Sequence, residues 1–557
     1  MYPGWGMDGA SLHSKESGVA PDRWCITKED LRFLRCEITR AIEDGTIKPT
    51  DRDAFDPRDD QVGPCMHNLV ESYIKPLTLA AGGMSWALLR HPQGLECHMF
   101  ITHCWAEGAY ELIDKVLASW PMGVQTAWCC IFANPQNLDI SDLIKEPRTS
   151  PFALALGSAS QLMVVPTRQT SIYSRIWCIY EAFLAVDMDK VVFTASAPVA
   201  RWVPRSAAIG GMLSVAGVGG GYSWRRIINE PTCGNLPIEL VLTWAVLTPA
   251  LVLSVLANRR PCASACANFL GFAIAMFNVG LWLYKVDVLA CQGGIYVGIL
   301  VVFAMEGAYF FANEYDRLCA VGVRSESDAL MVGYGGVRGA EASVETDRLR
   351  IWEEIGHRAH CVDMSIRVLI DSGMSTNSLR RASKKGVDLR SAAEVRWATC
   401  VGGVALYVFG VSFYGEGGHV AICGASGGAL LVIVARWCFA WRDEKAFIGS
   451  MLGKLAGLSL IIELCAILFD PHYTRKSRDV VYVVLTQTIL LLLFALVLLG
   501  RGRIVSIPCV GPWLVQVLGP GWACCRRRRS DRTGSGHEPD SHHSGQRGSD
   551  VSEPPDC

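Results

Sequence analysis

The chain has 557 residues, of which 50% are apolar and 19% charged, and its mean hydropathy is +0.25. A soluble enzyme of this length is usually less apolar and more charged, so a wholly water-soluble protein is not expected. The net charge of −1 gives no overall positive field, so the charge does not suggest nucleic acid as a partner.

The 22 cysteines are scattered along the chain, and several fall inside apolar runs. No Cys-x-x-Cys pair has the spacing of a zinc site. Buried free cysteine packs as a small apolar side chain, so the sequence predicts free thiols and no metal centre.

The N-terminal 95 residues divide into a polar start and a helical segment. Residues 1–22 are polar and rich in glycine, so we expect them to be disordered and not a signal peptide. The domain that follows is therefore expected in the cytosol. A helix is predicted over 27–44, because Thr27 and Asp30 resemble a capping box, an apolar stripe follows at helical spacing, and Gly45 ends it.

Between residues 96 and 195, short apolar runs alternate with helical stretches. Four runs are predicted to be buried strands: 98–103, 128–133, 161–165 and 191–195. Strands that alternate with helices are joined by right-handed crossovers, so the pattern predicts a parallel sheet. Functional residues in such sheets collect at the carboxyl ends of the strands.

Beyond residue 205 the apolar runs approach the roughly 20 residues that a helix needs to cross a bilayer. An additional run, 206–223, is short and rich in glycine, so it is either a weak span or a packing segment of small residues. Seven runs are predicted as clear spans: 240–257, 262–284, 288–311, 397–414, 419–435, 447–469 and 480–499.

The charged loop 313–396 decides between seven and eight spans. Its basic residues, like those of the tail after residue 500, place it in the cytosol by the positive-inside rule. With a cytosolic N-terminus, eight spans satisfy this requirement and seven do not. Basic residues at 225–226 and 475–478 are evidence against eight spans. On balance we favour eight spans.

Within this loop, apolar residues recur at helical spacing. The helix that they predict either lies on the membrane domain or forms a dimerising coiled coil. We favour the first, because the stretch is shorter than four heptads. The residues that carry the period are Ile351, Ile355, Val362, Ile366 and Leu369.

After the last span, 501–525 is broken by prolines and is predicted to be interfacial. Cys524 and Cys525 stand beside four arginines, a pattern that suits palmitoylation.

The sequence thus predicts an N-terminal α/β parallel-sheet domain joined to a polytopic α-helical transmembrane bundle. The predicted parts are a disordered start (1–22), a helical lead-in (23–95), the α/β domain (96–205), membrane helices (206–312), the charged loop (313–396), four further membrane helices (397–500), the interfacial segment (501–525) and a disordered tail (526–557).

Two motifs in the α/β segment carry a resemblance to a known family. FITHCW (100–105) and SRIWCIYEAFLA (174–185), with the polar loop between them, resemble the Toll/interleukin receptor (TIR) family, whose fold is flavodoxin-like. The match covers about residues 96–195. Multi-pass membrane proteins of protists carry a similar module.

The resemblance implies a candidate enzymatic site. In members of that family that cleave NAD, the glutamate of the WC-x-x-E helix is catalytic, and that position is Glu181 in this sequence. A carboxylate there would stabilise the positive charge that develops on the ribose as nicotinamide leaves, as in glycoside cleavage. By the same resemblance His103, Trp105, Glu107 and the loop 134–140 would border the nucleotide, and Trp177 lies one helical turn from Glu181.

Three functions follow from these patterns. The first is signalling or protein interaction through a cytosolic TIR-like domain, including self-association. The second is NAD hydrolysis by Glu181, with NAD as substrate and no other cofactor expected. The third is a channel or carrier, suggested by ionisable residues within predicted spans, namely Glu306, Lys454 and Glu463. We favour the first, because many members of the TIR family are adaptors and because the chain enters the membrane region after Ala195, before the fifth strand of a full TIR domain.

Overall fold

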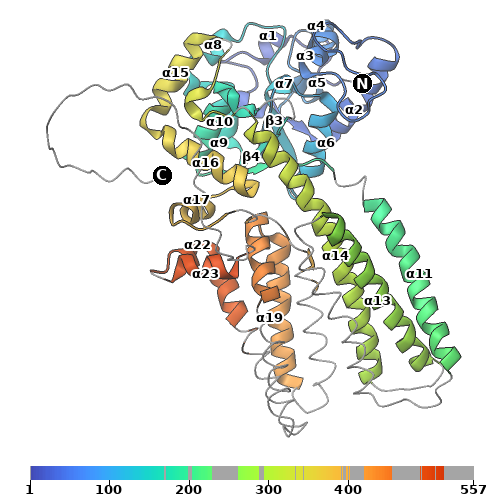
Figure 1. Ribbon diagram of the computed structural model, residues 1–557. Helices are drawn as coiled ribbons and strands as arrows, with labels where there is room; N and C mark the ends of the chain where they lie inside the picture. The colour runs from blue at the N-terminus through green and yellow to red at the C-terminus, as the bar shows by residue number, and fades with distance from the viewer. Residues whose placement is uncertain are drawn as a thin grey trace, which may run out of the picture. The chain divides into compact units, whose positions relative to one another are not determined.

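The computed structural model of the chain (Figure 1) describes residues 2–167, 171–198, 203–228, 261–287, 294–389 apart from 333 and 343, 420–454, 492–508 and 510–519, with isolated positions between 392 and 401 and at 488 and 490.

The predicted N-terminal helix is confirmed as α2 (Lys28–Glu43). The Thr27 side chain accepts a hydrogen bond from the backbone N–H of Asp30, and the Asp30 carboxylate accepts one from the backbone N–H of Thr27. This reciprocal pair satisfies two backbone donors that a helix start otherwise leaves without partners. Asp30 is also held by Arg90 and His91 at 2.8 and 2.6 Å, which fixes the start of α2 to the end of the lead-in.

Residues 2–22, expected to be disordered, instead pack on the lead-in helices. They contain the short helix α1 (Gly9–Leu12), and the backbone N–H groups of Gly4 and Gly9 donate to the carbonyls of Leu89 and Gly82. A Cβ at Gly9 would lie 2.3 Å from the backbone of Met84, so only glycine permits this approach. The glycines that suggested disorder therefore serve close packing. The lead-in also holds α3 (Met66–Leu69), the π-helical turn η2 (Val70–Ile74), α4 (Lys75–Ala81) and α5 (Trp86–Arg90).

Six strands form one mixed sheet in the order β1-β3-β2-β4-β5-β6. The four central strands are parallel and correspond to the four predicted ones, so the α/β class is confirmed. They are β2 (Met99–Thr102), β3 (Thr126–Cys129), β4 (Gln161–Val164) and β5 (Val191–Thr194). The edge strands β1 (Ile26–Thr27) and β6 (Met374–Ser375) are antiparallel to their neighbours, so the sheet is not wholly parallel.

The prediction that strand 128–133 continues to Ala133 is wrong. The strand ends at Cys129, and the next four residues form the helical turn α7 (Cys130–Ala133). Periodicity alone cannot separate a short buried strand from a buried helical turn, because both are apolar on every side.

Helices join the parallel strands as the crossover pattern requires. They are α6 (Ala109–Ser119) after β2, α8 (Ser141–Ile144) and α9 (Pro151–Ser158) before β4, and α10 (Ile176–Asp187) before β5. α2 packs on α6, and α9 packs on α10. The strands β2, β3 and β4 are buried along their whole length, as expected for a sheet covered on both faces.

The sheet is completed by a segment that lies more than 170 residues further along the chain. β6 pairs with β5, with Val192 opposite Ser375, and α15 (Glu345–Ile355) and α16 (Ala359–Ser372) pack on α10. The five residues of the predicted helical period in the charged loop are all buried. That period therefore faces the α/β domain, where α10 and β5 supply the apolar surface, and not a membrane domain.

Polar contacts tie the same segment to the end of α10. Tyr180 donates to Glu354 at 3.0 Å, and Arg358 pairs with Asp187. Arg380, in α17 (Asn377–Lys384), pairs with Asp189 at 2.7 Å. The α/β domain is thus built from two stretches of chain that flank a long apolar insertion.

Three long helices within this insertion pack side by side (Figure 1): α11 (Val203–Ile228), α13 (Pro261–Asp287) and α14 (Gly294–Met331). α11 contains the glycine-rich run 206–223, and it lies against α13 so closely that a Cβ at Gly221 would be 2.0 Å from the carbonyl oxygen of Phe277. Small residues thus serve helix packing here. A separate apolar cluster of Phe272, Trp282, Phe303 and Phe310 lies between α13 and α14.

Among the described residues, one helical stretch, Ser264–Asp287, is long and apolar enough to cross a membrane by length and composition, and α19 (Val420–Phe439) contains a shorter apolar stretch. The predicted span 240–257 lies wholly outside the described residues, and 397–414 and 447–469 lie largely outside them. Half of the predicted span 480–499 is described. The predicted interfacial segment contains α22 (Arg501–Val505) and α23 (Gly511–Leu518), and residues from 520 onward lie outside the description.

Candidate functional site

The candidate site lies at the carboxyl end of β2, the strand between β3 and β4 in the sheet. Thr102 ends this strand, and His103 and Cys104 follow it directly. α10 carries Glu181 to the same place, since Cys178 of that helix donates from Sγ to the carbonyl of His103 at 3.8 Å. The FITHCW and WC-x-x-E motifs therefore meet in space.

His103 is the centre of a buried polar cluster. Its Nε2 lies 3.2 Å from Cys130 Sγ, and its Nδ1 lies 3.2 Å from the carbonyl oxygen of Cys104. The same Nδ1 is 3.6 Å from a carboxylate oxygen of Glu107. His103 is 4% exposed and Glu107 is 1% exposed, so this pair is shielded from water.

Cys130, and not the neighbouring Cys104, is the cysteine beside the imidazole. Cys104 contacts the imidazole through its backbone carbonyl oxygen, which lies 3.2 Å from His103 Nδ1. A hydrogen bond with Cys129, together with burial, raises the pKa of the Cys130 thiol well above its usual value. A protonated thiol is a weak nucleophile, so the direction of this shift does not favour an activated cysteine–histidine pair.

Glu181 is a buried acid of the candidate site that the sequence predicted. It is 5% exposed, and its Oε2 is buried without a hydrogen-bond partner. Burial raises the pKa of Glu181 to about 7, although Thr102, His103 and Arg175 act in the opposite direction. Burial also raises the pKa of Glu107 well above its usual value. Carboxyl groups poised near neutral pH are typical of functional sites and also occur in buried structural networks.

The two tryptophans expected near the nucleotide lie in separate surroundings. The Trp177 ring stacks on Phe152 at 5.2 Å and meets Tyr180 edge-on at 6.0 Å, in the layer between α9 and α10. The Trp105 ring lies 5.1 Å from His67, in the lead-in helices. Trp177 and Glu181, four residues apart, therefore contact different parts of the domain, because the helix is buried on more than one side.

The loop 134–140 is fixed to the lead-in helices. Asn137 donates from Nδ2 to the carbonyl of Lys75 at 3.0 Å and to the Thr78 hydroxyl at 2.8 Å. Asn134, at the start of the loop, is 6% exposed, and its Oδ1 is buried without a hydrogen-bond partner. The loop thus presents one unsatisfied acceptor and is otherwise held in place.

A second buried ionic group, which the sequence did not suggest, joins α6 to α14. Lys115, which is 1% exposed, donates to Glu326 Oε2 at 2.6 Å and to the carbonyl of Pro166 at 2.6 Å, and it lies 3.0 Å from Glu111. Glu326 Oε1 also accepts from the backbone N–H of Ala197 at 3.4 Å. Lys115 and Glu326 are 211 residues apart, so no local pattern could have linked them.

The ionisable residues of the predicted spans do not form one site among the described residues. Glu306 is on α14, where its Oε2 is buried without a hydrogen-bond partner. Lys454 donates to the carbonyl of Val517 at 2.7 Å and to that of Gly519, so it caps the end of α23. Glu463 lies outside the described residues.

Comparison of the chain with protein-family models, with curated proteins and with solved structures gave no significant match. The resemblance to the TIR family is therefore neither supported nor contradicted by relatives. Within the described residues, no group of three or more His, Cys, Asp or Glu side chains is arranged to hold a metal ion.

Proposed function

We propose that the chain is a multi-pass membrane protein whose cytosolic, TIR-like α/β domain serves signalling through protein interaction, including self-association. The observation that carries the proposal is the path of α14. This helix packs on α13 at one part of its length and makes the buried Lys115–Glu326 pair with the α/β domain at another. A continuous helix that joins an apolar bundle to a folded domain can transmit a movement between them.

Exposed apolar side chains support the membrane part of the proposal. On α11, Met212 is 65% exposed, Val215 78% and Ile227 77%, and on α19 Leu431 is 73% exposed. Such side chains are costly in water when they gather on helices, and lipid is the solvent that accepts them.

The pairing of β5 with β6 supports an even number of crossings in the apolar insertion. A domain assembled from residues before 198 and after 322 lies on one side of a bilayer, so the chain between them has to return to that side. Four crossings, made by α11, the run 240–257, α13 and α14, meet this condition. The three clear spans alone do not, which favours eight spans in total over seven.

The membrane proposal is tested on the full chain expressed in cells. We expect it to sediment with membranes and to resist alkaline carbonate extraction. Epitope tags at the N-terminus and at exposed Gly386 should be digested together when protease is added to the cytosolic face of intact vesicles. A monodisperse soluble chain without detergent would refute the membrane part, and protection of one tag alone would refute the shared side.

NAD hydrolysis is the second candidate, and the raised pKa of Glu181 is the observation that favours it. The burial of this carboxylate favours the interaction role, since a nucleotide would reach it only after α10 or the strand ends moved. Purified full chain incubated with NAD at high protein concentration decides between the two. We expect no nicotinamide, whereas release by the wild type that disappears in Glu181→Ala would establish the enzyme instead.

The third candidate, transport, would rest on Glu463 and Glu306. Flux through vesicles that contain the purified chain, lost in Glu463→Gln, would favour it.

A further inference from the structure

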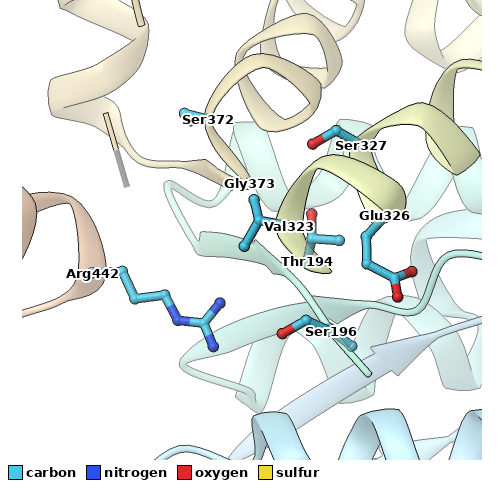
Figure 2. Close-up of a pocket in the computed structure, with 9 residues that line it drawn as sticks. Thr194, Ser196, Val323, Glu326, Ser327, Ser372, Gly373 and Arg442 are labelled. Carbon is cyan, nitrogen blue, oxygen red and sulfur yellow. The ribbon is translucent and has the colours of Figure 1, made fainter. Parts of the chain in front are cut away.

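A pocket lies at the carboxyl end of β5, where four parts of the chain meet (Figure 2). It holds about 310 Å³ of space, part of which is open to solvent. Its walls come from the end of β5, from α14, from the turn between α16 and β6, and from the segment after α19: they are Thr194, Ala195, Ser196, Val323, Glu326, Ser327, Ser372, Gly373 and Arg442.

Arg442 supplies an uncompensated positive charge. Figure 2 shows its side chain crossing from one wall of the pocket toward Ser196. Among the described residues, the guanidinium has neither a hydrogen-bond partner nor a carboxylate within ion-pair distance, and burial lowers its pKa. The Arg442 side chain is partly exposed, and a partly buried cation without a partner is a natural contact for an anion from outside the chain.

Glu326, the other charged residue of the wall, is already paired within the chain. Its Oε2 lies 2.6 Å from Lys115 Nζ, and its Oε1 accepts from the backbone N–H of Ala197. These contacts account for both of its oxygens, and Lys115, which Glu326 shares with Glu111, offsets part of its charge. Arg442 is the one cation among the residues that line the pocket.

Hydroxyl groups surround the space that Arg442 faces. Thr194 is 6% exposed, and its Oγ1 is buried without a hydrogen-bond partner, so a donor is held at the pocket wall with nothing to accept from it. Ser196 and Ser327 add two further hydroxyl side chains to the lining. One guanidinium and several hydroxyl donors are the groups that bind phosphate oxygens.

We propose that this pocket binds a phosphate group, with Arg442 as its charged contact and the Thr194 hydroxyl as a donor. The position agrees with the general rule that open α/β sheets bind ligands beyond the carboxyl ends of their strands. A bound phosphate would join β5 to α14 and to the segment after α19, so it would stiffen the joint between the α/β domain and the apolar helices. Free phosphate and a phospholipid headgroup offer the same chemistry.

Thermal unfolding of the purified full chain in a neutral detergent tests this inference. Inorganic phosphate is titrated against chloride at equal ionic strength, and in a second arm phosphatidic acid is added to the micelles against phosphatidylcholine. We expect a saturable rise in melting temperature in the first arm for a free-phosphate site, or in the second arm alone for a headgroup site.

Arg442→Gln should raise the half-saturating concentration about 10- to 100-fold, the range expected for loss of a charged hydrogen bond. Without ligand this variant should be at least as stable as the wild type, because it removes a partly buried charge that has no partner among the described residues. Thr194→Val should weaken binding by a smaller factor. The matched control is Arg381→Gln, which removes an exposed arginine outside the pocket and should leave binding unchanged.

Absence of stabilisation in both arms would overturn the proposal, and so would an equal response of the wild type and Arg442→Gln. Neither result depends on whether the chain signals or hydrolyses NAD.

Discussion

Replacement of Glu181 by glutamine should make the α/β domain more stable at pH 8 and leave its stability nearly unchanged at pH 5. The carboxyl group is buried, and its pKa is raised from 4.5 to about 7. In the unfolded chain the group ionises near pH 4.5, whereas in the folded domain it stays protonated until about pH 7. Stability is therefore lost as the pH rises through this interval, and the full cost is present above pH 7.

The size of this cost follows from the shift. About 2.5 pH units at roughly 1.4 kcal/mol each give about 3 kcal/mol above pH 7. Glutamine has the shape of the protonated acid and cannot ionise, so the variant avoids this cost. The difference between variant and wild type should grow from near zero at pH 5 to at most about 3 kcal/mol at pH 8.

The assay is unfolding of the full chain in detergent, followed by tryptophan fluorescence from pH 5 to 8. Glu353→Gln is the control, because it removes an exposed carboxylate of α15 and should show no such pH trend. A Glu181→Gln variant that is less stable than the wild type at pH 8 would refute the reasoning. That result would mean that ionised Glu181 stabilises the fold, for example by pairing with protonated His103.

Three other perturbations follow from the structure. Glu326→Ala leaves buried Lys115 with Glu111 as its remaining ion-pair partner and should cost up to about 3 kcal/mol by the same unfolding assay. Lys115→Met combined with Glu111→Leu and Glu326→Leu should recover most of the loss, and no recovery would contradict the pairing. Thr27→Ala removes the cap of α2 and should cost about 1 kcal/mol, measurable as faster hydrogen exchange in the first turn of that helix. Gly221→Leu should separate α11 from α13, because a side chain at this position would meet the backbone of α13. The yield of cysteine crosslinks between the two helices should therefore fall, and an unchanged yield would argue against the close contact.

The local elements were predictable because short-range patterns determine them. The capping box of Thr27 and Asp30 located the start of α2, and four apolar runs located the parallel strands. The run 128–133 was extended too far, because a buried strand and a buried helical turn look alike in composition. Glycines in residues 2–22 suggested disorder, but in the folded chain they allow close backbone contacts.

The candidate site was predictable only in part. Two motifs named His103 and Glu181, and the sheet brings them together. The side chain that His103 Nε2 contacts is Cys130, and no sequence pattern favours Cys130 over Cys104, the residue next to His103. Trp177 shares a helix with Glu181 but stacks on Phe152, because the direction of each side chain depends on what packs against the helix.

The sequence by itself determined the α/β alternation, the cap of α2 and the apolar character of the second half of the chain, since each depends on residues within a few positions of one another. Only the tertiary structure decided that β6 and α16 complete the sheet, that Lys115 pairs with Glu326, and that Arg442 faces Thr194 across a pocket. These contacts join residues more than 170 positions apart. Such pairing depends on how the chain returns to the sheet after the apolar insertion, and no local sequence pattern predicts that return.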